Sequence, residues 1–284
     1  MRSYLPDFEL RDARTLEEAL ALLAREPGAW RPFAGGTDLM VTLDAGALAH
    51  RRFVSLWALD ELRGIQVEEA GVWMGALTTY ADVLVHPVLS GEFPLLAEAA
   101  AQTGGVATQN RGTIGGNIAN GSPAADTPPA LLVYDAELEL VSASGARRVP
   151  YAGFHTGYKQ MDLRPGEIIA RVWLPRARSG WQEHYRKVGT RRAQAISKVC
   201  FAAAARVEDG LITSARIAFG SVAPMVIRCA HVESALVGAS SAGAAAAAVA
   251  ALARDIAPID DVRSSAAYRL RVAQNLLADF VGHL

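Results

Sequence analysis

Two glycine pairs, each set between apolar runs, are the residues of this chain best suited to hold a ligand. The first pair, Gly35 and Gly36, lies in RPFAGGTDLM, and the second, Gly115 and Gly116, lies in RGTIGGNIANGSPAAD. Adjacent glycines let backbone N–H groups approach a bound group closely, and that group is often a phosphate. Because neither pair stands beside clustered lysines and arginines, the two together predict a diphosphate bound mainly by backbone dipoles.

Polar side chains around the second pair suit the other parts of such a ligand. Thr113, Asn117, Asn120 and Ser122 supply neutral donors, whereas the acceptor-only carboxylate of Asp126 suits ribose or ribityl hydroxyls. Prolines nearby stiffen the segment and lower the entropy cost of holding it open. Taken alone, the first glycine pair has a simpler interpretation as a plain strand–helix turn, and Asn120 with the next glycine as a plain turn.

Residues that would perform catalysis without a cofactor are missing from the sequence. The six histidines lack metal-ligand spacing, no GxSxG nucleophile elbow occurs, and no pair of carboxylates stands out. Two cysteines, Cys200 and Cys229, cannot supply the four thiolates of an iron–sulfur cluster. We therefore expect no catalytic or metal-ligating side chains, and a bound cofactor that performs the chemistry.

Bulk composition limits the partners and the compartment. The 284 residues have a net charge of −1, so no basic field exists to hold a nucleic acid. The first ten residues contain no apolar signal core, and the longest small-apolar run, 244–253, is too short to span a bilayer. We expect a cytoplasmic protein without a membrane span.

Periodicity predicts a mixed α+β chain without the strict βαβ alternation of a Rossmann domain. Thr37 is the expected N-cap of a helix that runs to about Asp44, and a helical turn is expected to begin near Asp126. A hairpin is expected over 136–150, an antiparallel strand pair around Asp209, and a terminal helix whose apolar stripe is Tyr268, Val272, Leu276 and Phe280.

Four stretches in this order resemble the FAD-binding (medium) subunit of the molybdenum hydroxylases, the family that includes xanthine dehydrogenase and aerobic carbon monoxide dehydrogenase. They are AGGTDL, TIGGNIANGSPAADTPPALL, GEII and RRAQAISKV, and the likeness continues through DDVRSSAAYRLRVAQNLL. The resemblance implies a p-cresol methylhydroxylase-type FAD-binding domain over 1–175, with subdomains of about 1–55 and 56–175. A C-terminal α+β domain with an antiparallel sheet, 176–284, follows it.

The resemblance also implies which residues contact FAD, lying between the two subdomains with its pyrophosphate surrounded by both glycine segments. Asp126 matches the family's flavin-side carboxylate, Ile169 an apolar residue beside the cofactor, and Lys187 a flavin-contacting lysine. A cation there would stabilise anionic reduced flavin. The implied cofactor-binding set is Phe33, Ala34, Gly35, Gly36, Thr37, Asp38, Leu39, Thr113, Gly115, Gly116, Asn117, Asp126, Ile169 and Lys187.

One position departs from the family pattern, because Thr103 stands where eukaryotic relatives carry an aromatic residue near the flavin. The side chain that stacks on the flavin ring therefore stays open. Some members also carry a cysteine-rich insertion for an additional iron–sulfur cluster, which two cysteines cannot provide.

The family's organisation implies that this chain is one subunit of an oxidoreductase. A large subunit with a molybdenum cofactor hydroxylates the substrate, and a small subunit with two [2Fe–2S] clusters relays the electrons. The FAD-binding subunit passes them to NAD⁺ or another acceptor, and neither the substrate nor the acceptor is readable from this chain.

Two other functions stay open at this stage. A stand-alone flavin oxidase or reductase on the same fold would need its own base near the flavin, and no good candidate is present. A cofactor-free assembly scaffold would use the alanine-rich C-terminal region for contacts, and its loop glycines would be dispensable.

Overall fold

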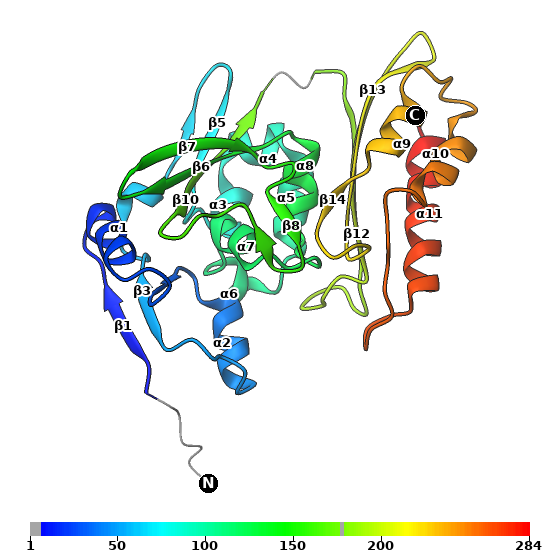
Figure 1. Cartoon of the computed structure of the whole chain (residues 1–284). Helices are drawn as coiled ribbons and strands as arrows, with labels where there is room; N and C mark the ends of the chain where they lie inside the picture. The colour runs from blue at the N-terminus through cyan, green and yellow to red at the C-terminus, as the bar shows by residue number, and fades with distance from the viewer. Residues whose placement is uncertain (1–6, 177–178) are drawn as a thin grey trace.

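The computed structural model describes residues 7–176 and 179–284, in which helices and strands alternate irregularly along the chain. Figure 1 shows two parts side by side, with an N-terminal and central part on one side and a sheet covered by helices on the other. No helix in the described ranges is long and apolar enough to cross a membrane.

The N-terminal region is a small parallel sheet with the order β1-β3-β2. Helix α1 connects its two edge strands and buries Leu20 and Leu23 against Trp30 and Val54. The elements are β1 (Glu9–Asp12), α1 (Leu16–Arg25), β2 (Arg31–Phe33), α2 (Thr37–Asp44) and β3 (Arg52–Ser55). The first glycine pair therefore follows the end of β2 and begins α2.

The central region is an antiparallel sheet with the order β4-β5-β10-β6-β7, and helices α3, α4, α5, α7 and α8 share its hydrophobic core. The five strands of this sheet are β4 (Ile65–Val67), β5 (Gly71–Gly75), β6 (Glu137–Ser142), β7 (Gly145–Pro150) and β10 (Ile168–Pro175). The 3₁₀ helix η1 (Asp60–Leu62) precedes them, and β8 (His155–Gly157) and β9 (Gln160–Met161) form a separate small pair. The helices of this region are α3 (Tyr80–Val85), α4 (Pro87–Glu92), α5 (Pro94–Gln102), α6 (Val106–Gln109), α7 (Ile114–Asn120) and α8 (Pro128–Val133).

The C-terminal region is an antiparallel sheet with the order β11-β12-β13-β14. Its elements are β11 (Gln182–Val188), β12 (Val199–Glu208), β13 (Leu211–Gly220), β14 (Ile227–Arg228), α9 (Ala230–Leu236), α10 (Ala244–Leu252) and α11 (Ala266–Gly282). Side chains of β12 alternate between two cores, because successive residues of a strand face opposite sides. Phe201 packs among α9 to α11, whereas Cys200 and Ala202 pack toward α5 and α8, which lie between the two large sheets in Figure 1.

The α+β class, the hairpin and the C-terminal antiparallel sheet are confirmed, and two predicted helix starts are wrong. The N-cap of α2 is Gly36, with φ of +75° and no side-chain cap, so Thr37 is the first helical residue. Helix α8 begins at Pro128 rather than near Asp126, since proline has a preset φ and no N–H that a first turn would leave unpaired.

The terminal helix α11 confirms three of the four residues of the predicted apolar stripe. Phe280 is buried, Val272 and Leu276 pack against the C-terminal core, and Tyr268 is 44% exposed. The buried face also carries Arg269, which a search for apolar periodicity passes over. The predicted domain boundary after residue 175 stays a prediction and adjoins residues 177–178, which lie outside the described ranges.

Acid sensitivity of the C-terminal region is expected from Asp261. Burial alone would raise the pKa of this carboxyl, but hydrogen bonds from the Arg263 N–H, the Arg269 guanidinium and the Ser264 N–H lower it to about 2. A lowered folded-state pKa contributes stability above the unfolded pKa that is lost as the pH falls toward the folded value.

We therefore expect Asp261→Asn to melt below the unsubstituted chain at pH 7, with the difference shrinking as the pH falls from about 4 toward 2. Thermal melts across that range measure it. A difference independent of pH would show that the Asp261 carboxylate does not contribute by its charge.

Candidate functional site

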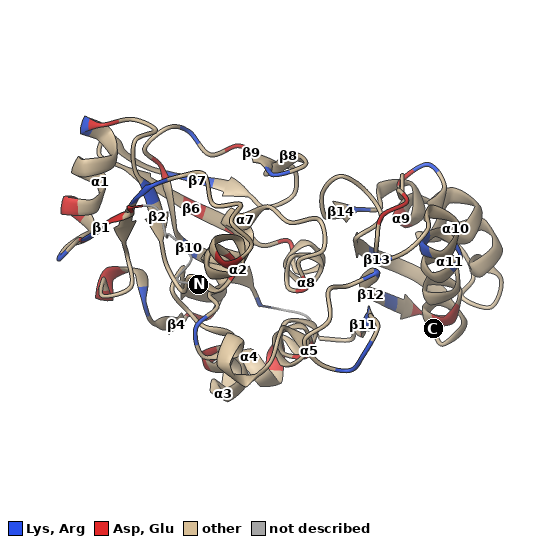
Figure 2. Ribbon diagram, turned by 90° about the horizontal axis from the view of Figure 1, so that it is seen from below, with Lys and Arg blue, Asp and Glu red and all other residues tan. Residues whose placement is uncertain are grey.

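The two glycine segments, 80 residues apart in the chain, touch each other. A Cβ added at Gly35 would lie 1.8 Å from the carbonyl oxygen of Arg111, and one added at Gly116 would lie 4.0 Å from the Cβ of Ala34. Helix α2 follows the first segment, the second pair lies in the first turn of α7, and both helices belong to the N-terminal and central part in Figure 2. Glycine at position 35 is therefore required for the two segments to meet.

The first segment presents a run of unpaired backbone donors. Within the described ranges, no acceptor is recorded for the N–H groups of residues 35–39. Three of these belong to the first turn of α2, whose N–H groups have no acceptor inside the helix. Together with the positive end of the helix dipole, such a run favours an anion.

Phe33 shapes this end of the site from within the same segment. Its ring lies directly under Gly36, where an added Cβ would stand 2.6 Å from the ring, and it packs edge-on against Phe53 at 6.3 Å. Because Gly36 also has φ of +75°, any other residue there would be strained twice.

The second segment has a different role from the one expected, because its glycine N–H groups are engaged. Gly115 donates to the Ala76 carbonyl at 2.9 Å, and an added Cβ would lie 2.5 Å from the Cβ of Ala76. Gly116 donates to Thr113 Oγ1 at 3.0 Å, which caps α7. These glycines therefore provide close packing rather than free donors, and the Thr113 hydroxyl hydrogen is what this segment offers to an anion.

A buried ion pair lies at the other end of the site. Lys187 Nζ stands 2.7 Å from Asp126 Oδ2, and their side chains are 5% and 10% exposed. The ammonium also donates to the carbonyl of Gln102, and Ser197 Oγ donates to Asp126 Oδ1 at 2.6 Å. Burial raises the pKa of the Asp126 carboxyl, while the charge and hydrogen bond of Lys187 and the Ser197 hydroxyl oppose that rise.

Hydrogen bonds connect this ion pair to the glycine segments. Thr127 Oγ1 donates to the side-chain oxygen of Asn117 on α7 at 2.7 Å. Tyr185, on β11, donates to the Asp126 carbonyl at 3.2 Å. Asp126 is thus held between α7 and β11, and both of its carboxylate oxygens already accept a bond inside the protein.

Ile169 lies beside the second segment on strand β10 and is 6% exposed. The carbonyl of its neighbour Ala170 accepts from the N–H of Ala76, whose own carbonyl accepts from Gly115. The structure therefore places the predicted residues in a continuous arrangement, from Phe33–Leu39 through Thr113–Asn117 and Ile169 to the Asp126–Lys187 pair.

A hollow of about 730 Å³ adjoins the ion pair. Besides Lys187, it is lined by three exposed arginines, Arg186, Arg191 and Arg192. Across the described ranges, none of these guanidiniums forms an ion pair with a carboxylate, and no cluster of histidine, cysteine and acidic residues could hold a metal ion. The hollow is therefore positively charged, as an anionic molecule would require.

Two family matches cover nearly the whole chain. Residues 6–177 match the FAD binding domain in molybdopterin dehydrogenase, and residues 183–284 match the CO dehydrogenase flavoprotein C-terminal domain. This chain belongs to the FAD-binding subunits of the molybdenum hydroxylases. The resemblance stated from the sequence is confirmed, and the chain is an oxidoreductase subunit with an FAD-binding domain.

Relatives of this FAD-binding subunit cover it almost from end to end. The xanthine dehydrogenase FAD-binding subunit of Escherichia coli O157:H7 is 35% identical over 93% of this chain and 91% of its own length. The carbon monoxide dehydrogenase medium chain of Hydrogenophaga pseudoflava is 30% identical over 96% of this chain and 95% of its own length.

Solved structures show the same fold. A carbon monoxide dehydrogenase structure from Hydrogenophaga pseudoflava, which lacks the Mo-pyranopterin moiety of the molybdenum cofactor, matches with a TM-score of 0.93 and 30% identity over 97% of this chain and 96% of its own. Quinoline 2-oxidoreductase from Pseudomonas putida 86 matches with a TM-score of 0.87 and 26% identity, covering 98% and 96%.

The residues of this FAD-binding subunit fit FAD. The unpaired amides of 35–39 suit a diphosphate, and the glycine contact between the segments leaves backbone where a side chain would fill the space. Thr103, the position at which the resemblance to eukaryotic relatives led us to look for an aromatic residue, is buried and donates to the Ala99 carbonyl. It closes α5 rather than facing a ligand.

Several residues of the site were not singled out from the sequence. Ser197 and Tyr185 hold Asp126, and the Arg111 guanidinium stacks over Trp57 at 3.8 Å beside the meeting point of the two segments. The sequence could have pointed to Ser197, because this residue lies inside the motif RRAQAISKV. Nothing in the sequence pointed to Tyr185, because its role depends on β11 lying beside Asp126.

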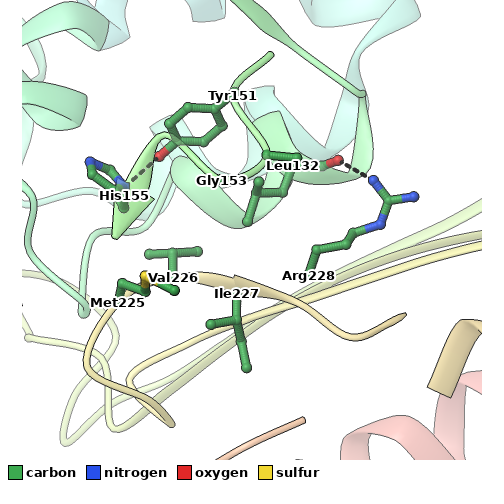
Figure 3. Close-up of a pocket in the computed structure, with 9 residues that line it drawn as sticks. Leu132, Tyr151, Gly153, His155, Met225, Val226, Ile227 and Arg228 are labelled. Carbon is green, nitrogen blue, oxygen red and sulfur yellow. Dashed lines mark hydrogen bonds between the residues drawn. The ribbon is translucent and has the colours of Figure 1, made fainter. Parts of the chain in front are cut away.

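A second, smaller hollow of about 200 Å³ lies between β8 and β14 (Figure 3). His155 is held there by the Ile118 carbonyl at 2.9 Å, and its pKa is lowered by burial. Arg228 donates to the Leu132 carbonyl and pairs with Asp135. The charged group of this hollow, the Arg228 guanidinium, is therefore already engaged within the protein.

Proposed function

We propose that this chain binds FAD across the arrangement described above and transfers electrons within a multi-subunit molybdenum hydroxylase. The observation that supports this proposal most strongly is the contact between Gly35 and the Arg111 carbonyl. This contact brings the unpaired amides of 35–39 close to the Thr113 hydroxyl. In this proposal the amides of Gly35, Gly36, Thr37, Asp38 and Leu39 and the Thr113 hydroxyl hold the diphosphate. Phe33 and Ala34 on one side and Gly115, Gly116 and Asn117 on the other form the surrounding wall, because the N–H groups of the last three are already bonded within the protein.

Asp126, Ile169 and Lys187 hold the flavin end in this proposal. FAD, when bound, supplies the reversible uptake of electrons that no side chain of this chain can provide. Lys187 places a positive charge there, and the buried Asp126 and the Gln102 carbonyl fix its ammonium in one position. Such a charge favours the reduced, anionic form of a neighbouring flavin.

The proposed electron route begins at [2Fe–2S] clusters of a small partner subunit, passes through FAD on this chain and ends at NAD⁺ or another acceptor. A large partner subunit with the molybdenum cofactor would perform the hydroxylation. The arginine-lined hollow beside Lys187 supports an acceptor that carries negative charge. Buried free thiols at Cys200 and Cys229 suit a reducing compartment, and we place the complex in the cytoplasm.

Purification of the native complex tests this function. We expect molybdenum, iron and FAD to co-purify with this chain and two partner chains, one large subunit and one small, cysteine-rich subunit. The isolated chain should be yellow. A folded, colourless chain that takes up no added FAD would contradict the proposal, and purification as a single flavoprotein chain with its own activity would favour a stand-alone flavin enzyme.

A further inference from the structure

Arg269 is a charged residue in a fully packed position. It lies near the start of α11 and is only 3% exposed. Burying a guanidinium is costly unless its N–H groups are paired, so an arginine at such a position needs specific partners.

Three partners hold the guanidinium. Its Nη1 donates to the carbonyl oxygens of Lys198 at 3.1 Å and Ser221 at 2.7 Å, and its Nη2 donates to Asp261 Oδ1 at 2.7 Å. In the described part of the chain its Nε has no partner. Two of the partners are therefore backbone groups on separate segments, which the planar guanidinium fixes relative to each other.

Both segments lead directly to the buried ion pair of the FAD site. Ser221 Oγ donates to the Ser197 carbonyl at 2.9 Å, and the Ser221 N–H donates to the Pro123 carbonyl at 2.7 Å. Ser197 in turn donates to Asp126, the partner of Lys187. A chain of hydrogen bonds thus connects α11 to the carboxylate from two sides.

The backbone of Ser221 shows that this arrangement is held rather than relaxed. Its φ is +66°, in the left-handed region that a serine rarely occupies. A residue keeps such a conformation only where its surroundings determine it, and here three hydrogen bonds of Ser221, with Arg269, the Ser197 carbonyl and the Pro123 carbonyl, do so.

We propose that Arg269 is a positioning residue for FAD, which holds the Ser197 hydroxyl on Asp126 and thereby fixes Lys187 at the flavin end. This inference rests on the proposed function. A purely structural Arg269, which only fastens α11 to the sheet, would affect stability without affecting the flavin.

The test compares FAD affinity and flavin reduction potential in the full-length chain and its variants. Arg269→Met removes every donor, and Ser197→Ala removes the hydroxyl that reaches Asp126. We expect each substitution to weaken FAD binding about three- to tenfold, as for one lost hydrogen bond to a charged group. Both substitutions should also shift the flavin reduction potential, in the same direction as each other. In the double variant the second change should add little, because the two act in one chain.

Leu277→Ala is the matched control, because Leu277 is fully buried on the same helix and has no connection to Asp126. It should lower the melting temperature and leave FAD affinity unchanged. Should Arg269→Met fail to fold, Ser221→Ala removes the bond to the Ser197 carbonyl and is expected to weaken FAD binding in the same sense.

Normal FAD affinity and potential in Arg269→Met, or strictly additive losses in the double variant, would overturn the inference. So would an equal loss of FAD affinity in Leu277→Ala, because stability alone would then explain the effect. If the unsubstituted chain binds no FAD, the proposed function fails first.

Discussion

Gly35→Ala is expected to abolish FAD retention, with at least a hundredfold loss of affinity. The added methyl group would stand 1.8 Å from the Arg111 carbonyl oxygen, which belongs to the backbone and cannot move aside as a flexible side chain could. Overpacking of this kind typically costs about 1–3 kcal/mol, and relief requires the two segments to separate. Separation would remove the amide run of 35–39 from the Thr113 hydroxyl. Equilibrium titration of the flavin-free chain with FAD measures the loss.

Gly91→Ala is the matched control for this substitution. Gly91 lies in α4, and nothing stands within 4 Å of its added Cβ. Alanine in a helix is more stable than glycine by about 0.8–1 kcal/mol, so this variant should melt slightly higher and bind FAD normally. FAD binding by Gly35→Ala at the unsubstituted level would show that the junction of the two segments does not form the diphosphate site.

Lys187→Met is expected to have the second large effect. Removing one partner of a buried ion pair leaves an uncompensated charge, which typically destabilises a protein by about 3–5 kcal/mol. Asp126 would keep only the Ser197 hydroxyl and would hold a proton more readily. Loss of the cation should also lower the reduction potential of bound flavin. Thermal melts and a potentiometric titration measure the two effects.

The pH dependence of Lys187→Met gives a further check. Without Lys187, burial raises the folded-state pKa of Asp126 above its unfolded value. Such a group stabilises the fold at low pH and loses that contribution as the pH rises through the folded pKa. The variant should therefore lose less stability at pH 5 than at pH 8, and a pH-independent loss would speak against a buried unpaired carboxylate.

Arg216→Met provides the control for charge removal. Arg216 pairs with Asp135 at 3.0 Å, but the two side chains are 33% and 46% exposed, and exposed pairs contribute about 0–1 kcal/mol. Its removal should change the melting temperature little and leave the flavin potential unchanged.

Local patterns predicted most of the elements. The Ser-Gly hairpin, the antiparallel pair around Asp209 and the capped helices follow from period-2 alternation and cap residues, which depend on near neighbours. The first turn of α2 was misplaced by one residue because Thr37 is a good N-cap by type. The left-handed Gly36 takes that position instead, which becomes visible only in the structure.

The site was predictable only in part, for a related reason. The glycine segments were recognisable, but the engagement of the Gly115 N–H by Ala76 depends on the turn after β5, 39 residues earlier in the chain. Tyr185, Ser197 and Arg269 act through carbonyl and carboxylate oxygens brought close by the C-terminal sheet. Such contacts leave no periodic signal in the sequence, so residue type alone could not assign these roles.

The most direct test of the central claim compares FAD with riboflavin, which has the same ring system and no diphosphate. If the unpaired amides of 35–39 and the Thr113 hydroxyl hold the diphosphate, the flavin-free chain should bind FAD at least a thousandfold more tightly than riboflavin, a difference of about 4 kcal/mol. Equal affinities, or no binding of FAD, would contradict the account.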